Sequence, residues 1–155
     1  MKLYKVKKSN IDNRGLYAAA NIKKGTIIIY YKGKLITKKE TERNPKYDNE
    51  KAIYLFNVNN RYDLDGDFEY NTARLINHSC NPNCEVDGKG LKLWIFAIKD
   101  IKKGKELSYD YGFGYDKDYK DYVCKCGSKN CCGYIVREGS RWRIKKKSKN
   151  AIKRV

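Results

Sequence analysis

The chain has 155 residues, which is enough for one domain with a hydrophobic core of its own. Its 35 Lys and Arg against 18 Asp and Glu give a formal net charge of +17, which favours a polyanionic partner: nucleic acid, a nucleic-acid complex or an anionic membrane surface. No apolar run approaches the ~20 residues of a membrane span, and the first residues lack the apolar core of a signal peptide, so we expect an intracellular protein that does not enter a membrane.

Short alternating and β-branched segments follow one another along the chain and predict a mainly β architecture. Gly, Asn or Asp stands at most of the breaks between them. The segments expected to form strands or short apolar stretches are residues 2–6, 16–20, 26–31, 35–36, 52–58, 62–64, 85–86, 91–98 and 105–111. A short helix is expected over residues 37–43, ended by Asn44-Pro45, and residues 87–90 are expected to close a hairpin.

The chain contains two similar turns, Asn21-Ile-Lys-Lys-Gly25 and Asp100-Ile-Lys-Lys-Gly104. Each ends in a glycine after two lysines, a pattern typical of a tight turn. No internal repeat of useful length surrounds them in the sequence, so we interpret the likeness as a coincidence of turn chemistry.

Residues 74–84 concentrate chemically useful side chains. This stretch, Arg-Leu-Ile-Asn-His-Ser-Cys-Asn-Pro-Asn-Cys, holds the only His of the chain, one of its two Pro and two of its six Cys. Its apolar start predicts an anchor in the core, and Asn81-Pro82-Asn83 predicts a sharp turn, because Pro fixes φ and Asn tolerates the left-handed region. A plain surface turn would have the same pattern, so other motifs must decide between the two.

The six cysteines favour a metal or catalysis over disulfides, because thiols inside a cell stay reduced. Residues 124–133 place three of them around a Gly-bearing turn, as in a zinc knuckle: Cys124, Cys126 and Cys131. A tetrahedral zinc needs a fourth thiolate, from Cys132, Cys80 or Cys84. Cys132 would tend to point away from the metal as a neighbour of Cys131, so we favour Cys80. Unligated thiols or a catalytic cysteine are the alternatives, and the latter would need the single His as its base.

The segment Glu106-Leu-Ser-Tyr-Asp-Tyr-Gly-Phe113 carries three aromatic rings at alternate positions, those of Tyr109, Tyr111 and Phe113. In a strand these rings would lie on one side. The pattern alone indicates either a core face or a functional aromatic surface.

Together, these segments resemble a SET-domain protein-lysine methyltransferase that carries a post-SET zinc segment. The matching stretches follow the family's order over nearly the whole chain: residues 14–18 with 22–25, 31–33, 74–84, 106–113 and 124–133. The combination of Asn77-His78-Ser79-Cys80 with Tyr109-Asp110-Tyr111 is specific, whereas the Gly15 motif alone is weak. The resemblance implies a mainly β SET-domain fold of small curved sheets, in which the Asn77-His78 segment and the Tyr111 segment cross in a knot-like arrangement.

The resemblance also implies roles for individual residues. Those that would hold S-adenosylmethionine are Arg14, Gly15, Leu16, Arg74, Asn77 and His78. Tyr111 would be the catalytic tyrosine, with Tyr109 and Tyr31 as the other aromatic residues of the catalytic set. Tyr31, Tyr109 and Phe113 would line a narrow channel for the substrate lysine. Asn13 departs from the family, which usually has a glycine there, and this could loosen contact with the cofactor.

The zinc ligands implied by the resemblance are Cys80, Cys124, Cys126 and Cys131, in agreement with the ligand count above. The chain would then divide into a SET domain at residues 1–115, a post-SET zinc segment at 116–136 and a basic C-terminal tail at 137–155. That tail holds nine Lys or Arg against the single acid Glu138. It would be either a solvated end or a non-specific electrostatic contact to DNA around the target.

The activity implied is methylation of a protein lysine by S-adenosylmethionine, with a histone tail or nucleosome as the expected substrate. Mono- or dimethyl-lysine would be the main product, because a hydroxyl on Tyr109 can hold a water in the space that a methylated amine needs. Two alternatives stay open: a methyltransferase of a non-histone basic protein, and a non-catalytic, zinc-stabilised module that binds nucleic acid or chromatin. The protein would work in a nucleus, either its own or that of a host reached by a virus or bacterium.

Overall fold

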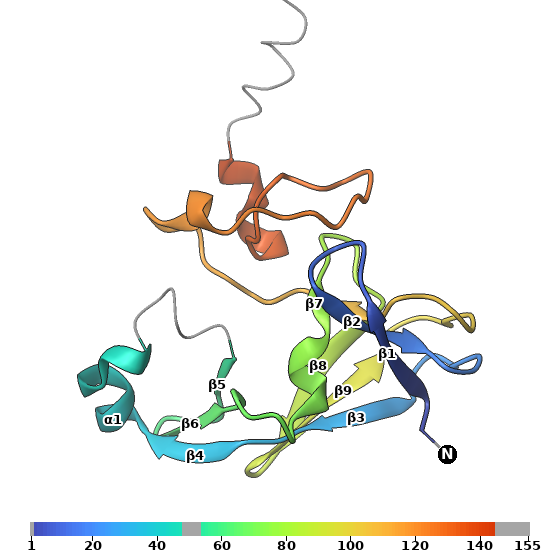
Figure 1. Cartoon of the computed structure of the whole chain (residues 1–155). Coiled ribbons are helices and arrows are strands. Elements are labelled where there is room, and N and C mark those ends of the chain that lie inside the picture. Colours follow the sequence, from blue (N-terminus) through green and yellow to red (C-terminus); the bar gives the residue numbers. More distant parts are fainter. Residues whose placement is uncertain (1, 48–53, 145–155) are drawn as a thin grey trace, which may run out of the picture.

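The computed structural model describes residues 2–47 and 54–144 (Figure 1). Its strands are β1 (Tyr4–Lys8), β2 (Arg14–Ala18), β3 (Ile27–Tyr31), β4 (Lys34–Thr37), β5 (Leu55–Asn57), β6 (Tyr62–Asp65), β7 (Asn77–His78), β8 (Cys84–Lys89), β9 (Lys92–Ala97) and β10 (Ser108–Tyr109). Its helices are α1 (Lys38–Arg43) and the short 3₁₀ turns η1 (Pro45–Tyr47), η3 (Thr72–Leu75), η4 (Tyr119–Asp121) and η5 (Glu138–Arg143). The expected mainly β class is confirmed. No helix among these described residues is long and apolar enough to cross a bilayer.

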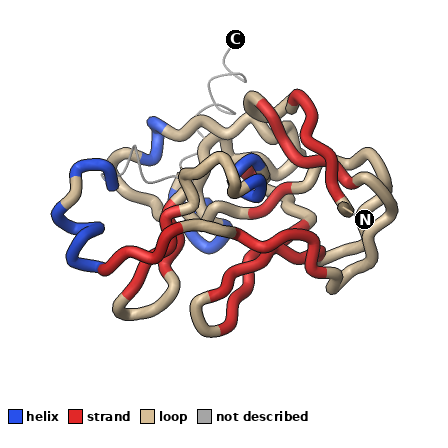
Figure 2. Tube along the Cα trace, turned by 60° about the horizontal axis from the view of Figure 1, so that its bottom comes forward, coloured by secondary structure: helices blue, strands red, loops and turns tan. Residues whose placement is uncertain are grey.

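The strands form four small sheets rather than one large one. Two three-stranded antiparallel sheets, β3-β9-β8 and β4-β6-β5, make the body of the molecule. β1 and β2 pair antiparallel as a hairpin beside them, and β10 pairs with β7 in parallel. Figure 2 shows the strands running through the molecule and α1 at the end away from the N-terminus.

The local sequence predicts some elements well. The β-branched run at residues 26–31 forms β3, and Thr37 caps α1 by accepting a hydrogen bond from the Glu40 N–H. The helix ends at Arg43, and its C-cap Asn44 is extended directly before Pro45.

Other boundaries differ from the sequence prediction. Lys89 pairs with Lys92, so the hairpin turn falls on Gly90-Leu91, where Gly90 supplies a φ of 63°. The strand expected over residues 105–111 is only β10, because the chain leaves the sheet after Tyr109. Gly112 follows in the left-handed region with φ of 73°, so the rings of Tyr111 and Phe113 are not placed by strand alternation.

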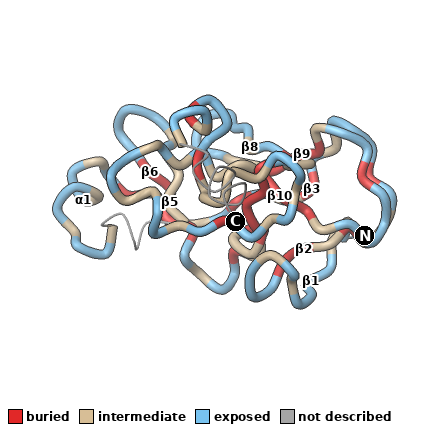
Figure 3. The backbone as a smooth tube through the Cα atoms, turned by 90° about the horizontal axis from the view of Figure 1, so that it is seen from above, coloured by how far each residue is buried: buried red, intermediate tan, exposed pale blue. Residues whose placement is uncertain are grey.

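The hydrophobic core lies where the sheets meet. Its completely buried members include Leu16 of β2, Ile76 before β7, Ile95 of β9 and Leu107 before β10. Figure 3 shows the buried backbone concentrated around β3, β9 and β10, with exposed turns around the rim. The core therefore fixes the backbone on which the segment at residues 76–80 and the segment at residues 107–111 stand.

The chain from residue 116 to residue 144 lies as a separate layer beside β7 (Figure 1). Val136 and Ser140 are both buried, and the Arg137 N–H donates to the Phe113 carbonyl at 2.8 Å. The first residues of the basic tail are therefore packed against the domain. The rest of that tail, residues 145–155, lies outside the described residues.

Candidate active site

The segment at Asn77-His78 and the segment at Tyr111 lie side by side. Asn77 pairs with Ser108 and His78 with Tyr109 in the parallel ladder of β7 and β10. Just beyond this ladder, the Tyr111 N–H donates to His78 Nδ1 at 3.0 Å, and the Tyr111 hydroxyl donates to the Ile76 carbonyl at 2.7 Å. Tyr111 is thus held by both its backbone and its side chain.

A cavity of about 740 Å³ opens beside these paired segments, a size that accommodates a cofactor. It lies between the β1–β2 loop, the segment around Asn77 and the C-terminal layer. The expected site residues that line it are Arg14, Arg74, Asn77, His78, Tyr111 and Phe113. Gly15 and Leu16 are buried in β2 behind it.

The β1–β2 loop is tied to Asn77 through Glu106, a residue to which the sequence assigned no role. Asn77 Nδ2 donates to Glu106 Oε1 at 2.9 Å and to the Arg14 carbonyl at 3.2 Å. The Ser9 hydroxyl donates to the same carboxylate oxygen at 2.6 Å. A Cβ added at Gly15 would overlap Glu106 Oε1, so glycine is required for this close approach.

Asn13 keeps the backbone shape that a glycine would have there. Its φ is 42°, in the left-handed region that Asn tolerates better than most residues. Its carbonyl accepts a hydrogen bond from the Ser9 N–H at 2.9 Å, which closes the loop.

His78 is a structural acceptor. Burial and, to a smaller extent, the positive charge of Arg141 lower its pKa, whereas Asp110 raises it, and the net pKa is about 4. At neutral pH the imidazole is therefore uncharged, and Nδ1 must be unprotonated because it accepts the Tyr111 N–H. Its Nε2 faces Cys80 Sγ at 3.8 Å, so this one ring contacts both the tyrosine segment and the cysteine cluster.

The aromatic residues form a continuous cluster of tilted rings, in which Tyr111 and Phe113 line the cavity and Tyr109 lies behind them. The ring centroids of Tyr109 and Tyr111 are 4.9 Å apart, and those of Tyr111 and Phe113 are 5.7 Å apart. Tyr31 does not line the cavity. It packs on Phe56 at 4.5 Å, which in turn lies 6.2 Å from Tyr109.

Burial keeps the hydroxyls of the three tyrosines, Tyr31, Tyr109 and Tyr111, protonated. It raises the pKa of Tyr111 and of Tyr109 above the usual value for a tyrosine, and raises that of Tyr31 as well. The hydroxyls can therefore donate and accept hydrogen bonds, but none is poised to remove a proton near neutral pH.

Four cysteine thiols converge beside His78. The sulfurs of Cys80, Cys124, Cys126 and Cys131 all lie within 4.8 Å of one another. A tetrahedral zinc with Zn–S bonds of about 2.3 Å would space its sulfurs about 3.8 Å apart, and those of Cys80 and Cys124 are 3.9 Å apart. The donor set and its spacing fit a structural zinc.

The other two thiols stand outside this cluster. Cys84 is completely buried, and burial raises its pKa to about 12, so it stays a thiol. The Cys132 thiol donates to the Tyr134 carbonyl at 3.1 Å. Of the three candidates for the fourth ligand, only Cys80 is placed with the knuckle.

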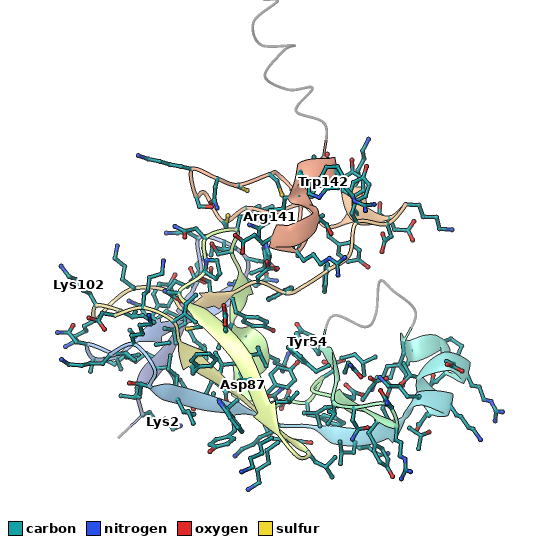
Figure 4. The ribbon with its side chains drawn as sticks, turned by 180° about the vertical axis from the view of Figure 1, so that it is seen from behind. Lys2, Tyr54, Asp87, Lys102, Arg141 and Trp142 are labelled. Atoms are coloured by element: carbon teal, nitrogen blue, oxygen red, sulfur yellow. The ribbon has the colours of Figure 1, made fainter. Side chains whose placement is uncertain are left out.

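Two further residues of the site were missed by sequence reasoning. Tyr54 lines the cavity, and the Arg74 guanidinium carbon lies 5.7 Å from the centroid of its ring. Figure 4 shows Tyr54 beside the C-terminal layer. Arg141, assigned only to the basic tail, donates to the Cys80 carbonyl at 2.9 Å and pairs with Asp110. The motif Tyr109-Asp110-Tyr111 contains the Asp110 carboxylate, but nothing in the sequence indicates that Arg141 is its partner.

Comparison with known proteins identifies this architecture. A family model of the SET domain matches residues 13–112, which is more than half of the chain. The chain belongs to the SET-domain family. The matched region contains β2, the parallel pair of β7 and β10, and Tyr111, so it includes part of the cavity wall.

Curated SET-domain relatives resemble most of this chain. It is 39% identical over 134 residues to "Histone-lysine N-methyltransferase trithorax" of Drosophila virilis, which covers 83% of the chain. It is 38% identical over 130 residues to "Histone-lysine N-methyltransferase 2D" of Homo sapiens and 37% over 140 residues to "Putative histone-lysine N-methyltransferase 1" of Plasmodium falciparum. The matched regions are 3%, 2% and 2% of these relatives. The chain thus spans a small fraction of their length.

Proposed function

We propose that this SET-domain chain is a protein-lysine N-methyltransferase that uses S-adenosylmethionine and acts on histones. The observation that carries the proposal is the pairing of the Asn77-His78 segment with the segment that leads to Tyr111. Tyr111 is fixed between Ile76 and His78 at the wall of a cavity of about 740 Å³. The names of the relatives, all histone-lysine N-methyltransferases, support the same substrate class.

The cavity has the groups that S-adenosylmethionine requires. Arg14, Arg74, Lys8 and Lys125 at its wall would attract the carboxylate of the cofactor. Gly15 and Leu16 of β2 would lie against the cofactor, Asn77 would hold the adjoining β1–β2 loop through its bonds to the Asp12 and Arg14 carbonyls, and His78 would fix the segment at Tyr111. The cofactor supplies the methyl group on a positively charged sulfonium.

The nucleophile must be a neutral lysine amine. Neutralising a free lysine at pH ~8 costs about 3 kcal/mol. A buried aromatic wall and a nearby positive charge both disfavour the ammonium, which lowers this cost. Among the described residues of the cavity wall, burial raises the pKa of Tyr111 so that it stays protonated, His78 Nδ1 is already accepting a hydrogen bond, and Asp12 is exposed. The proton would therefore leave to water before methyl transfer.

The tyrosines would orient the amine rather than exchange protons with it. The Tyr111 hydroxyl commits its hydrogen to the Ile76 carbonyl, so its oxygen lone pairs remain available to accept from the amine or from the polarised methyl group. Tyr109, buried next to it, would hold a water and limit the product to mono- and dimethyl-lysine. Tyr31 would support this wall through Phe56, and Phe113 would complete the lysine channel at the C-terminal layer.

The zinc would be structural. Cys124, Cys126 and Cys131 belong to the C-terminal layer, whereas Cys80 directly follows β7, so a shared ion would join that layer to the active-site segment. We place the SET domain at residues 1–115 and the post-SET zinc segment at 116–136. The basic tail at 137–155 would contact nucleosomal DNA, which would put the protein in a nucleus.

The direct test is incubation with methyl-labelled S-adenosylmethionine and a panel of core histones and non-histone basic proteins, followed by mass-spectrometric mapping of the modified lysine. We expect label on a histone lysine and on few other proteins. Label on a non-histone basic protein alone would replace the substrate assignment. The absence of label on any protein, with the cofactor bound, would contradict the enzymatic proposal.

A further inference from the structure

The two lysine turns are paired in space. Ile22 and Ile101 form a bridge in which each backbone N–H donates to the other's carbonyl, at 2.8 and 2.7 Å. Both isoleucine side chains are buried, with 3% exposure each. The similarity between residues 21–25 and residues 100–104, which the sequence suggested was a coincidence, thus has a structural consequence.

Each turn also caps the other. Asp100 Oδ1 accepts the Lys24 N–H at 2.9 Å, and Asn21 Oδ1 accepts the Lys103 N–H at 2.9 Å. In each turn, the side chain of the first residue therefore accepts a hydrogen bond from the backbone N–H of the second lysine in the other turn. Because the backbones are fixed in this reciprocal way, little backbone order remains to be lost when the surface binds a partner.

The paired turns present a surface of six exposed lysines, which we call the lysine-turn surface. Its members are Lys23, Lys24, Lys99, Lys102, Lys103 and Lys105. None of them forms an ion pair within residues 2–47 and 54–144. The acidic residue between them, Asp100, accepts a hydrogen bond from the Lys24 backbone N–H with one carboxylate oxygen. Figure 4 shows Lys102 at the edge of the molecule, well away from Arg141 and Tyr54.

We propose that the lysine-turn surface binds the phosphate backbone of duplex DNA. Closely spaced, unpaired lysines on a fixed backbone suit a regular array of phosphates and carry no means of reading bases. Stable attachment to a lipid surface would require apolar side chains beside the charges. Residues 21–25 and 99–105 expose no large hydrophobic side chain, which favours DNA.

The test compares two full-length variants that each lose four positive charges. In the first, Lys23, Lys24, Lys102 and Lys103 are changed to Gln. The control changes Lys34, Lys39, Lys89 and Lys92, all exposed on other elements, to Gln. Both variants have a formal net charge of +13, from +17 less 4, so any difference between them reports position rather than total charge.

Binding to a 30-base-pair duplex is measured across a salt series, without cofactor or turnover, so the result stands apart from the proposed activity. We expect the lysine-turn variant to bind about tenfold or more weakly. Its slope of log Kobs against log salt should be shallower by about 2 to 4, because each phosphate contact contributes about 0.9. The control should change less, and replacing the same four lysines by Arg should preserve binding.

Equal weakening of both variants, or a lysine-turn variant that binds like the unmodified chain, would overturn the proposal. Vesicles containing phosphatidylserine provide the second arm. Loss of vesicle binding with unchanged DNA binding would also overturn it, because the surface would then serve a membrane. Thermal unfolding of each variant establishes that the fold is retained.

Discussion

Arg141 Nη2 donates to Asp110 Oδ2 at 2.9 Å, and so joins the last described helix to the residue before Tyr111. Its Nη1 donates to the Cys80 carbonyl at 2.9 Å. One guanidinium therefore contacts the C-terminal layer, the segment after β7 and the tyrosine segment together. The same carboxylate also accepts the Gly112 and Glu138 N–H groups, so Asp110 is a shared anchor of the site.

Replacing Arg141 by Ala should loosen this junction. The lost hydrogen bonds include a charge-assisted pair whose arginine is 11% exposed, so we expect a loss of about 2 kcal/mol in the free energy of unfolding. We also expect kcat to fall more than the affinity for cofactor. Chemical denaturation and steady-state kinetics measure the two effects.

Arg143→Ala is the matched control, because Arg143 stacks on the exposed Trp142 and lies in the same helix. It should change neither quantity appreciably. A similar loss in both variants would mean that Arg141 acts only through the general charge of the helix.

The zinc assignment is tested by two adjacent cysteines. Cys131→Ser should lose bound zinc and destabilise the C-terminal layer, because its sulfur belongs to the four-thiol cluster. Cys132→Ser should retain about one zinc per chain, since its thiol is bonded to the Tyr134 carbonyl. Metal analysis of the purified variants decides the matter, and equal zinc loss in both would refute the ligand set.

Gly15→Ala should disturb the cofactor loop. Its new methyl group would overlap Glu106 Oε1 and displace the carboxylate that holds Asn77. We expect cofactor affinity to fall about tenfold or more, a loss near 1.4 kcal/mol. Gly139→Ala is the control, because its added Cβ meets no atom within 4 Å. Calorimetric titration with S-adenosylmethionine measures both, and unchanged affinity in Gly15→Ala would exclude this role for the loop.

Tyr109→Phe should raise the methylation state of the product. The change removes the hydroxyl while keeping a ring 4.9 Å from Tyr111, so it frees space without opening a large cavity. Mass spectrometry of the product peptide should show more trimethyl-lysine at equal extents of reaction. An unchanged distribution would show that Tyr109 does not limit product size.

The elements predicted best were those fixed by local chemistry. β3 forms where β-branched residues cluster, and Thr37 begins α1 as a capping residue should. The convergence of Cys124, Cys126 and Cys131 was also predicted from local spacing, because three thiols around a short turn have few uses other than holding a metal. Cys80 could be favoured as the fourth ligand only because Cys132, as a neighbour of Cys131, would tend to point away from the metal.

The parts that could not be predicted depend on contacts between distant residues. Nothing near Glu106 indicates that its carboxylate holds Asn77, and nothing near Arg141 indicates Asp110. The pairing of Ile22 with Ile101 likewise joins turns about 80 residues apart in the chain. Tyr31 packs on Phe56 and not at the cavity wall, a placement that depends on how the sheets pack, and its role in the lysine channel stays a prediction.

The most direct test of the proposed site is Tyr111→Phe. The hydroxyl that bonds the Ile76 carbonyl would be lost, while the Tyr111 N–H bond to His78 would remain. We therefore predict that histone methylation falls about 100-fold or more, with S-adenosylmethionine affinity within a few-fold of the unmodified chain. Methylation at the unmodified rate in this variant would contradict the proposed function, because the paired segments at Asn77-His78 and Tyr111 would then not build the catalytic centre.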